Sequence, residues 1–229
     1  CGTAEGSFTM PLNAVSNEVR SVALRASEAT AGLRLLSAAQ RNACVQAYGS
    51  SLPGAAEAIQ RAAEDDAAHA RAHGLAPRVL QALVVDRATL EGKARLAAPL
   101  AALPDPLGQV ESTWIRPNGL KIERLRVPIG VVAILAEYDV GAVIDAVLLG
   151  LKAGDAVIVH AGPIMFRTCQ AVMRALAAVP LPPALRVAPV QFVPHHGSHA
   201  RQELLTQRGR VDVAIPVGSA AWIHAAEAV

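Results

Sequence analysis

Apolar residues in the first hundred positions recur at the three- and four-residue spacing of an amphipathic helix. Pro53 suits the first turn of a later helix, and Gly74 is a stop signal. The first run contains Val15, Val19, Val22, Ala23 and Ala26. We therefore expect a helical region that ends at Leu103-Pro104-Asp105-Pro106, with helices after the first at 38–48, 53–73, 77–84 and 89–102.

Two β-like runs follow, at 110–115 and 120–127. Pro117-Asn118-Gly119 lies between them and is a hairpin signal. In the second run apolar residues alternate imperfectly with charged ones, as in a ribbon with one exposed face. We expect the polar face of this hairpin to meet solvent or a partner.

From residue 129 onward, strand-like and helix-like segments alternate. The expected strands are 129–136, 156–159, 185–193 and 211–216, and the first is continuously apolar, as a strand buried on both faces requires. The expected helices are 141–152, 165–179 and 199–207, and Ser219 caps a last one. This order predicts the α/β class, with a helical segment and a hairpin before a doubly wound parallel sheet.

Composition narrows the class of protein. The chain of 229 residues is 52% hydrophobic and only 3% aromatic, so the core is built from small aliphatic side chains. A net charge of +2 gives no electrostatic footprint for nucleic acid, and the hydrophobicity excludes disorder. The sequence also offers no membrane span. Three widely spaced cysteines form no disulfide framework and indicate a reducing compartment.

The start of the chain reads as a segment outside the fold. Residues 1–9 are rich in Gly, Ser and Thr and precede Met10. We interpret residues 1–10 as a tag remnant or a disordered terminus, and not as a signal peptide. A lipoprotein start at Cys1 is the weaker alternative.

In a parallel sheet of this kind, ligands bind outside the carboxyl ends of the strands. Gly218-Ser219 is the best local signal, because a helix start offers free N–H groups and a positive dipole end to a phosphate. An ordinary helix cap is the alternative. The strand ends are Glu137-Tyr138-Asp139, His160-Ala161-Gly162-Pro163, Pro194-His195-His196 and Pro216-Val217-Gly218-Ser219. No G-x-G-x-x-G and no P-loop lysine is present.

Other polar residues have both a structural and a functional interpretation. A cluster of histidines could hold a metal, but a solvated loop is favoured because no cysteine or carboxylate is adjacent. Three carboxylates could act in acid–base chemistry, or as helix caps and salt-bridge partners. Cys44 and Cys169 read as buried small apolar residues. The histidines are His195, His196 and His199, and the carboxylates are Glu137, Asp139 and Asp145.

Several stretches of the chain together carry a resemblance to a known family. The longest is LKIERLRVPIGVVAI at 120–134, and the others are AHGL at 72–75, DPLGQV at 105–110, LKAGDAVI at 151–158 and VDVAIP at 211–216. In this order they resemble γ-glutamyl phosphate reductase, also called glutamate-5-semialdehyde dehydrogenase, of the aldehyde dehydrogenase superfamily. The resemblance covers about residues 15–224.

The resemblance implies a cofactor-binding domain, a catalytic domain and an oligomerisation hairpin. The family reduces γ-glutamyl phosphate with NADPH, a step of proline biosynthesis, through a thioester on a catalytic cysteine. That cysteine lies downstream of the matched region, so we expect the catalytic domain and its nucleophile to be absent from this chain. By the same resemblance, residues 11–108 are the helical part of the cofactor-binding domain, 109–127 the hairpin and 128–229 the Rossmann-like sheet.

The ligand-facing turns depart from the family pattern. The family has Glu-Ser-Arg-Pro-Asn where this chain has Glu137-Tyr138-Asp139-Val140-Gly141. It has Arg-Gly-Gly at both later turns, where this chain has His160-Ala161-Gly162 and Val217-Gly218-Ser219. We assign possible cofactor contacts to Glu137, His160, Gly162, Gly218 and Ser219, and no catalytic or metal-binding residue. NADPH binding is expected to be weak or lost.

Two hypotheses follow. In the first, the chain is a non-catalytic relative, a pseudoenzyme that serves as a structural or binding subunit. It would form a homo-oligomer or join other subunits through the hairpin 109–127 and the uncovered side of the sheet, because a missing catalytic domain exposes apolar surface. In the second, it is the NADPH-binding portion of an active oxidoreductase whose catalytic half lies elsewhere. Either would be cytoplasmic, or located in an organelle matrix.

Overall fold

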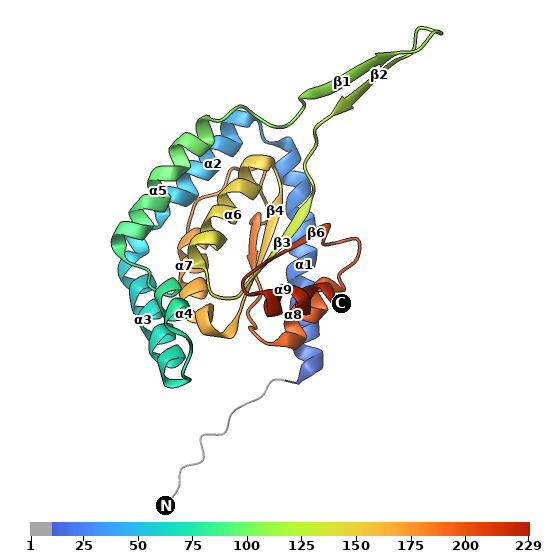
Figure 1. Ribbon diagram of the computed structural model, residues 1–229. Coiled ribbons are helices and arrows are strands. Elements are labelled where there is room, and N and C mark those ends of the chain that lie inside the picture. Colours follow the sequence, from blue (N-terminus) through green and yellow to red (C-terminus); the bar gives the residue numbers. More distant parts are fainter. Residues whose placement is uncertain (1–10) are drawn as a thin grey trace, which may run out of the picture.

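The computed structural model describes residues 11–229 as one long helical segment, a hairpin and an α/β sheet (Figure 1). The expectations for residues 1–10 lie outside the described residues. The helices are α1 (Leu12–Leu35), α2 (Ala38–Ser51), α3 (Ala56–Ala72), α4 (Pro77–Ala82), α5 (Arg87–Ala102), α6 (Val140–Ala153), α7 (Phe166–Ala177), α8 (Ser198–Leu205) and α9 (Ala220–Glu227), with short 3-10 turns at Pro53–Ala55 and Pro163–Met165. The strands are β1 (Val110–Ile115), β2 (Lys121–Leu125), β3 (Val131–Ala136), β4 (Ala156–Ala161), β5 (Val190–Phe192) and β6 (Val213–Val217).

Four strands form the parallel sheet at the centre of the molecule, in the order β5-β4-β3-β6. The chain moves outward from β3 to β4 and β5 and then crosses back to β6, which is the doubly wound arrangement. Every residue of β3 and β4 is buried. The continuous apolar runs that predicted these strands are thus explained, because both faces of the sheet are covered.

Helices cover the two faces of the sheet (Figure 1). α6 packs on β3 and β4, and α2 and α5 pack behind it in an outer layer. α7 is the crossover from β4 to β5 and contacts α3. α1 packs on β4, β5 and α8, and α8 is the crossover back to β6. The predicted α/β class and the helical segment before it are confirmed.

Small side chains allow the layers to approach closely. α1 turns Val19, Ala23 and Ala26 inward, and all three are fully buried. On α6, a Cβ atom at Gly150 would lie 2.5 Å from a methyl group of Val157 on β4. Gly154 ends α6 in the left-handed conformation, with φ of +82°. The low aromatic content therefore corresponds to a tightly layered core of alanine, valine and leucine.

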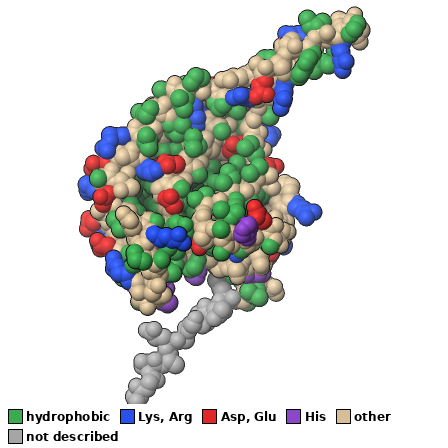
Figure 2. Space-filling model, viewed as in Figure 1, with side chains coloured by type: hydrophobic (Ala, Val, Ile, Leu, Met, Phe, Trp, Pro, Cys, Tyr) green, Lys and Arg blue, Asp and Glu red, His purple; other side chains and the backbone are tan. Residues whose placement is uncertain are grey.

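The hairpin of β1 and β2 projects away from the body (Figure 1). Almost every residue of the two strands is exposed, and Figure 2 shows hydrophobic and basic side chains side by side along it. The exposed apolar residues are Val110, Trp114, Ile115, Leu120, Ile122, Leu125 and Val127. The structure contains no partner chain, so the expected interface on this hairpin stays a prediction.

The third predicted strand of the sheet was wrong in extent. Residues 185–193 were expected to be extended, but β5 has only three residues, Val190–Phe192. Pro189 precedes the strand and has no N–H to donate, and the prolines at 180, 182 and 183 lead the chain through turns and bends. The other predicted elements differ from the observed ones by a few residues at their ends. Within residues 11–229, no helix has the length and apolar character needed to cross a membrane.

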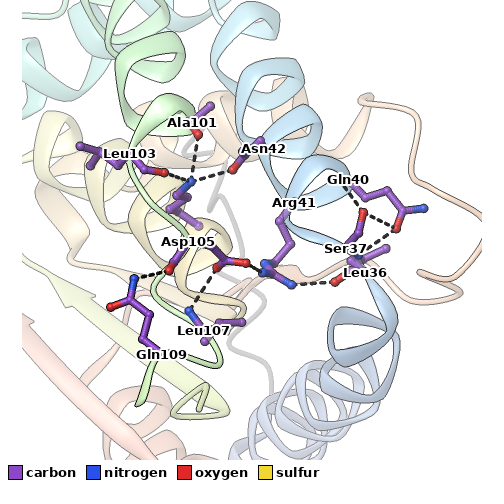
Figure 3. Close-up of polar contacts among 11 residues, drawn as sticks. Leu36, Ser37, Gln40, Arg41, Asn42, Ala101, Leu103, Asp105, Leu107 and Gln109 are labelled. Carbon is purple, nitrogen blue, oxygen red and sulfur yellow. Dashed lines mark hydrogen bonds and ion pairs between the residues drawn. The ribbon is translucent and has the colours of Figure 1, made fainter. Parts of the chain in front are cut away.

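A buried amine ties three helices together. The Nζ atom of Lys152 on α6 donates to Asn42 Oδ1 at 2.7 Å and to the carbonyls of Ala101 at 2.9 Å and Leu103 at 2.7 Å. The two carbonyls belong to the end of α5, where helical partners run out. Figure 3 shows Asn42, Ala101 and Leu103 pointing toward one place, beside the ion pair of Arg41 with Asp105. Lys152 is thus a cap for α5 supplied by another helix.

We expect Lys152→Met to lower the free energy of unfolding by about 2 to 3 kcal/mol. Methionine keeps the length of the buried stem but leaves three acceptors without a donor. Equilibrium unfolding in urea measures the change. Lys121→Met, on the exposed hairpin, is the matched control and should change stability by less than about 0.5 kcal/mol. Equal stabilities of the two variants would contradict the capping role.

Candidate functional site

Three strand ends meet at one edge of the sheet, where the sequence placed the candidate ligand contacts. Glu137 follows β3, Gly162 follows β4, and Gly218 with Ser219 leads from β6 into α9. Backbone bonds join these ends: Glu137 N–H donates to the Val217 carbonyl at 2.9 Å, and Gly162 N–H donates to the Ala136 carbonyl at 2.7 Å. The structure therefore brings Glu137, Gly162, Gly218 and Ser219 together.

The first turn of α9 is occupied by side chains of the protein itself. Ser219 Oγ accepts from the Trp222 N–H at 3.3 Å and is the predicted N-cap. The Ser219 N–H, which the sequence offered to a phosphate, donates to Glu137 Oε2 at 2.6 Å. A carboxylate is favoured at this position because the amino end of a helix carries a partial positive charge.

The two glycines at this edge make room for Glu137. A Cβ atom at Gly218 would lie 2.6 Å from both Cβ and Oε2 of Glu137. A Cβ atom at Gly162 would lie 2.8 Å from the carbonyl oxygen of Glu137. In this conformation, both glycines allow Glu137 to approach the backbone closely because they have no side chain.

His160 lies in β4 and is fully buried. Within residues 11–229, neither of its ring nitrogens has a hydrogen-bond partner. Burial lowers the pKa of His160 to about 4, and the nearby charges of Arg201 and His196 act in the same direction; the backbone of Gly197 opposes them from close by, outside the geometry of a full hydrogen bond. The imidazole is therefore neutral at pH 7. The sequence could not show this, because the residues that bury the imidazole are distant along the chain.

Trp222 and Arg201 complete this edge, and no sequence motif marked either residue. The Trp222 ring stacks on His160 with 6.2 Å between ring centroids, and the Arg201 guanidinium carbon lies 4.4 Å from the Trp222 ring centroid. The Nε atom of Arg201 is buried and has no partner among the described residues. Trp222 is one of only two tryptophans in the chain, and this rarity was the available signal.

Trp222 also supplies a hydrogen bond that Pro216 cannot make within the sheet. Asp212 N–H donates to the Val131 carbonyl, so the alternation of parallel pairing puts the nitrogen of Pro216 opposite the Leu135 carbonyl. Proline has no N–H to give. Trp222 Nε1 donates to that carbonyl instead, at 2.8 Å. The indole is thus held in place by β3, Arg201 and His160.

The other candidate residues have partners of their own. His195 Nε2 bonds Glu18 Oε2 at 2.7 Å, His199 Nε2 lies 3.0 Å from Ser16 Oγ, and His196 packs edge-on against Phe166. No group of three potential metal ligands occurs among residues 11–229. The two carboxylates have structural partners: Asp139 Oδ1 caps α6 through the Ala142 N–H, and Asp145 pairs with Lys93.

Both described cysteines are buried and free. Burial raises the pKa of the Cys44 thiol and, more strongly, that of the Cys169 thiol, where the Asp66 carboxylate adds to the shift. A raised pKa keeps the thiol protonated and unreactive. The structure therefore agrees with the interpretation of Cys44 and Cys169 as packing residues.

Comparison with known proteins places this arrangement in a family. No protein-family model matches the chain. A γ-glutamyl phosphate reductase of Symbiobacterium thermophilum is 40% identical over 208 residues, which are 91% of this chain and 49% of that protein. The chain is a homologue of γ-glutamyl phosphate reductase. It spans about half the length of the curated relatives that it matches.

Solved structures agree with the fold of this γ-glutamyl phosphate reductase homologue. The Thermotoga maritima γ-glutamyl phosphate reductase superposes with a TM-score of 0.83 at 23% identity, over 92% of this chain and 51% of that one. An NAD-dependent benzaldehyde dehydrogenase of Corynebacterium glutamicum gives a TM-score of 0.72 at 17% identity, over 93% of this chain and 43% of that one. The expected aldehyde dehydrogenase-like fold is confirmed.

In this homologue, two of the positions that depart from the pattern implied by the resemblance lie at this edge. His160 stands where the resemblance implies arginine, and it is buried under Trp222. Val217 stands at the other arginine position, with its carbonyl bound to Glu137 N–H. Glu137, the one residue of its turn that matches the family, contacts the start of α9. By the resemblance, this edge therefore holds a histidine and a valine in place of two arginines, on a sheet that keeps the family fold.

Proposed function

We propose that the chain is the nicotinamide-cofactor-binding half of a γ-glutamyl phosphate reductase, with NADPH as the cofactor. The homology supports this function, and so does the kinship of the fold with a dehydrogenase named as NAD-dependent. The observation that carries it is the meeting of three parallel strand ends at the start of α9. Such an edge is where open α/β sheets bind dinucleotides.

The residues at this edge fit the charge of a dinucleotide. α9 presents its amino end after Gly218, and the side chains of His160 and Arg201 hold buried nitrogens without partners. A charged guanidinium, a neutral imidazole N–H and a helix amino end are donors that suit a diphosphate or a ribose phosphate. We propose that Ser219 and Gly218 bind the diphosphate and that His160 and Arg201 lie toward the phosphate-bearing ribose. When bound, NADPH supplies the hydride for reduction of the acyl group.

The chain's own residues do the binding and orientation in this proposal. Cys44 and Cys169 are buried thiols with raised pKa and do not serve as nucleophiles. We propose that the part of the relatives that this chain does not match carries the thiolate chemistry. γ-Glutamyl phosphate, proline biosynthesis and a cytoplasmic location belong to the same proposal.

Calorimetry with NADPH tests this function. We expect a dissociation constant below about 1 mM, the upper end of ordinary substrate affinities. Ser219→Asp should weaken binding at least about tenfold, because aspartate still caps the helix but places a negative charge where the diphosphate would lie. The matched control is Ser37→Asp at the cap of α2, which should leave the affinity unchanged. No binding at 1 mM NADPH would contradict the proposal.

The second candidate is a non-catalytic subunit of a larger assembly. Two observations favour it: the exposed apolar side chains of the projecting hairpin, and the carboxylate that occupies the start of α9. The same calorimetry separates the candidates. An absence of NADPH binding, together with a molar mass in light scattering above that of one chain, would support the subunit.

A further inference from the structure

We propose that Glu137 is an internal substitute for the ligand's anion, so that a dinucleotide binds this edge only when the Glu137 carboxylate leaves the start of α9. The inference rests on the proposed function, since it concerns the same site. It adds a residue that sets how strongly the site accepts negative charge.

α9 does not need Glu137 as a cap. Asp86 and Asp139 each cap the helix that follows them with one side chain, and α2 takes both of its caps, Ser37 and Gln40, from its own start. α9 already has such a cap in Ser219, whose Oγ accepts from the Trp222 N–H. Glu137 Oε2 is a second acceptor at the same end, 2.6 Å from the Ser219 N–H, and it comes from a strand 82 residues away. The Glu137 carboxylate therefore occupies the position at which an incoming anion would bind.

The backbone around Glu137 is shaped to its side chain. A Cβ atom at Gly218 would lie 2.6 Å from Glu137 Oε2 and 3.1 Å from Cδ1 of Trp222. Glu137 and Trp222 thus meet over the same glycine, one as an anion and the other as an aromatic ring. The protein itself thus places an anion and an aromatic ring at this site, and these are the two kinds of group that a nucleotide would bring.

The polar and charged groups near Glu137 indicate that an anion from outside the protein would bind here. Glu137 forms no ion pair with any described residue. Around Trp222, the His160 ring nitrogens and Arg201 Nε are buried and unpartnered. The edge thus holds a carboxylate without a cation, a guanidinium nitrogen without an acceptor and a neutral imidazole without a hydrogen-bond partner. An anion that displaces Glu137 and also contacts His160 and Arg201 would supply the missing hydrogen-bond partners.

Glu137→Gln tests the inference because it removes the charge and keeps the shape. Inorganic pyrophosphate and NADPH are the probes, titrated separately. A Trp114→Phe background leaves Trp222 as the sole tryptophan, so its fluorescence reports on the site. We expect Glu137→Gln to bind pyrophosphate about tenfold more tightly than the background chain, since one close negative charge is gone. Glu137→Ala should bind at least as tightly as Glu137→Gln.

Asp139→Asn is the matched control. It removes the same charge two residues away, from a side chain that caps α6 and does not touch α9. We expect its pyrophosphate affinity to stay within about twofold of the background chain. Thermal unfolding of each variant checks that the fold is kept, and Glu137→Gln is the variant to rely on if Glu137→Ala is unstable.

The outcomes separate this inference from the proposed function. Tighter pyrophosphate binding by Glu137→Gln, with no NADPH binding by any variant, would support the internal anion and contradict the cofactor. NADPH binding that is equal in the background chain and in folded Glu137→Gln would overturn the internal anion alone. No pyrophosphate binding by folded Glu137→Gln would also overturn it.

Discussion

Replacing Asp66 with alanine should lower the free energy of unfolding by about 4 kcal/mol. Asp66 lies on α3, is fully buried and accepts from both the N–H and the Oγ1 of Thr168 at 2.8 Å. Arg167 Nη1 lies 3.3 Å from the other carboxylate oxygen. The acceptor is lost in the variant, and the Thr168 donors remain buried without partners.

The effect is large because Asp66 caps a helix to which it is not adjacent in sequence. α7 begins after Met165, and its own first residues supply no side-chain cap. Asp66 meets the amino end of α7 instead, where a negative charge is stabilised by the helix dipole. α3 and α7 are therefore joined by this carboxylate as well as by apolar packing.

Guanidinium unfolding followed by circular dichroism measures the loss. Asp65→Ala is the matched control, because Asp65 is the exposed neighbour on the same helix and forms no ion pair with a described residue. It should change stability by less than about 0.5 kcal/mol. Asp66→Asn keeps an acceptor and should fall between the two. A loss below about 1 kcal/mol in Asp66→Ala would show that Asp66 does not cap α7.

The layered fold could be predicted because its signals are local. The apolar runs of β3 and β4 are buried on both faces, and the helices around them carry regular spacing with stop signals such as Gly154. β5 was overestimated because its length depends on which residues pair with β4, and only three do. Hydrophobicity from residue 185 onward could not reveal that limit.

The candidate site could be predicted only in outline. The positions of strand ends follow from topology, so Glu137, Gly162 and Ser219 were expected at one edge and lie there. What each residue contacts depends on side chains far away in sequence. Ser219 meets a carboxylate of the protein itself, and His160 meets Trp222, which stands 62 residues later. Periodicity and motif spacing hold no information on such contacts.

Acid should destabilise the protein through His160, by roughly 3 kcal/mol between pH 7 and pH 4. The pKa of His160 is about 4 in the folded state, and the ordinary value is 6.5. Between these values the unfolded chain binds a proton at this position and the folded chain does not. Stability therefore rises with pH across this window. The contribution of His160 to stability is complete above pH 6.5 and is lost as pH falls toward 4. Each unit of difference corresponds to about 1.4 kcal/mol.

His160→Leu isolates this contribution from that of the carboxylates, which also titrate in acid. At pH 7.5 the variant should be at least as stable as the parent chain, since leucine leaves no buried nitrogen unpaired. At pH 4.5 it should be more stable by a further 2 to 3 kcal/mol, a rough figure from the same shift. His73→Gln, at an exposed histidine, controls for the loss of an imidazole as such.

Urea unfolding at intervals between pH 4.5 and pH 7.5 gives the slope for each chain. Parallel curves for the parent and His160→Leu would mean that His160 gains a proton as readily in the folded state as in the unfolded one. Trp222 would then not seal the end of β4 from water. A steeper curve for the parent would show that the imidazole stays neutral beneath Trp222, and an added anion that reaches His160 should flatten that curve by supplying the missing partner.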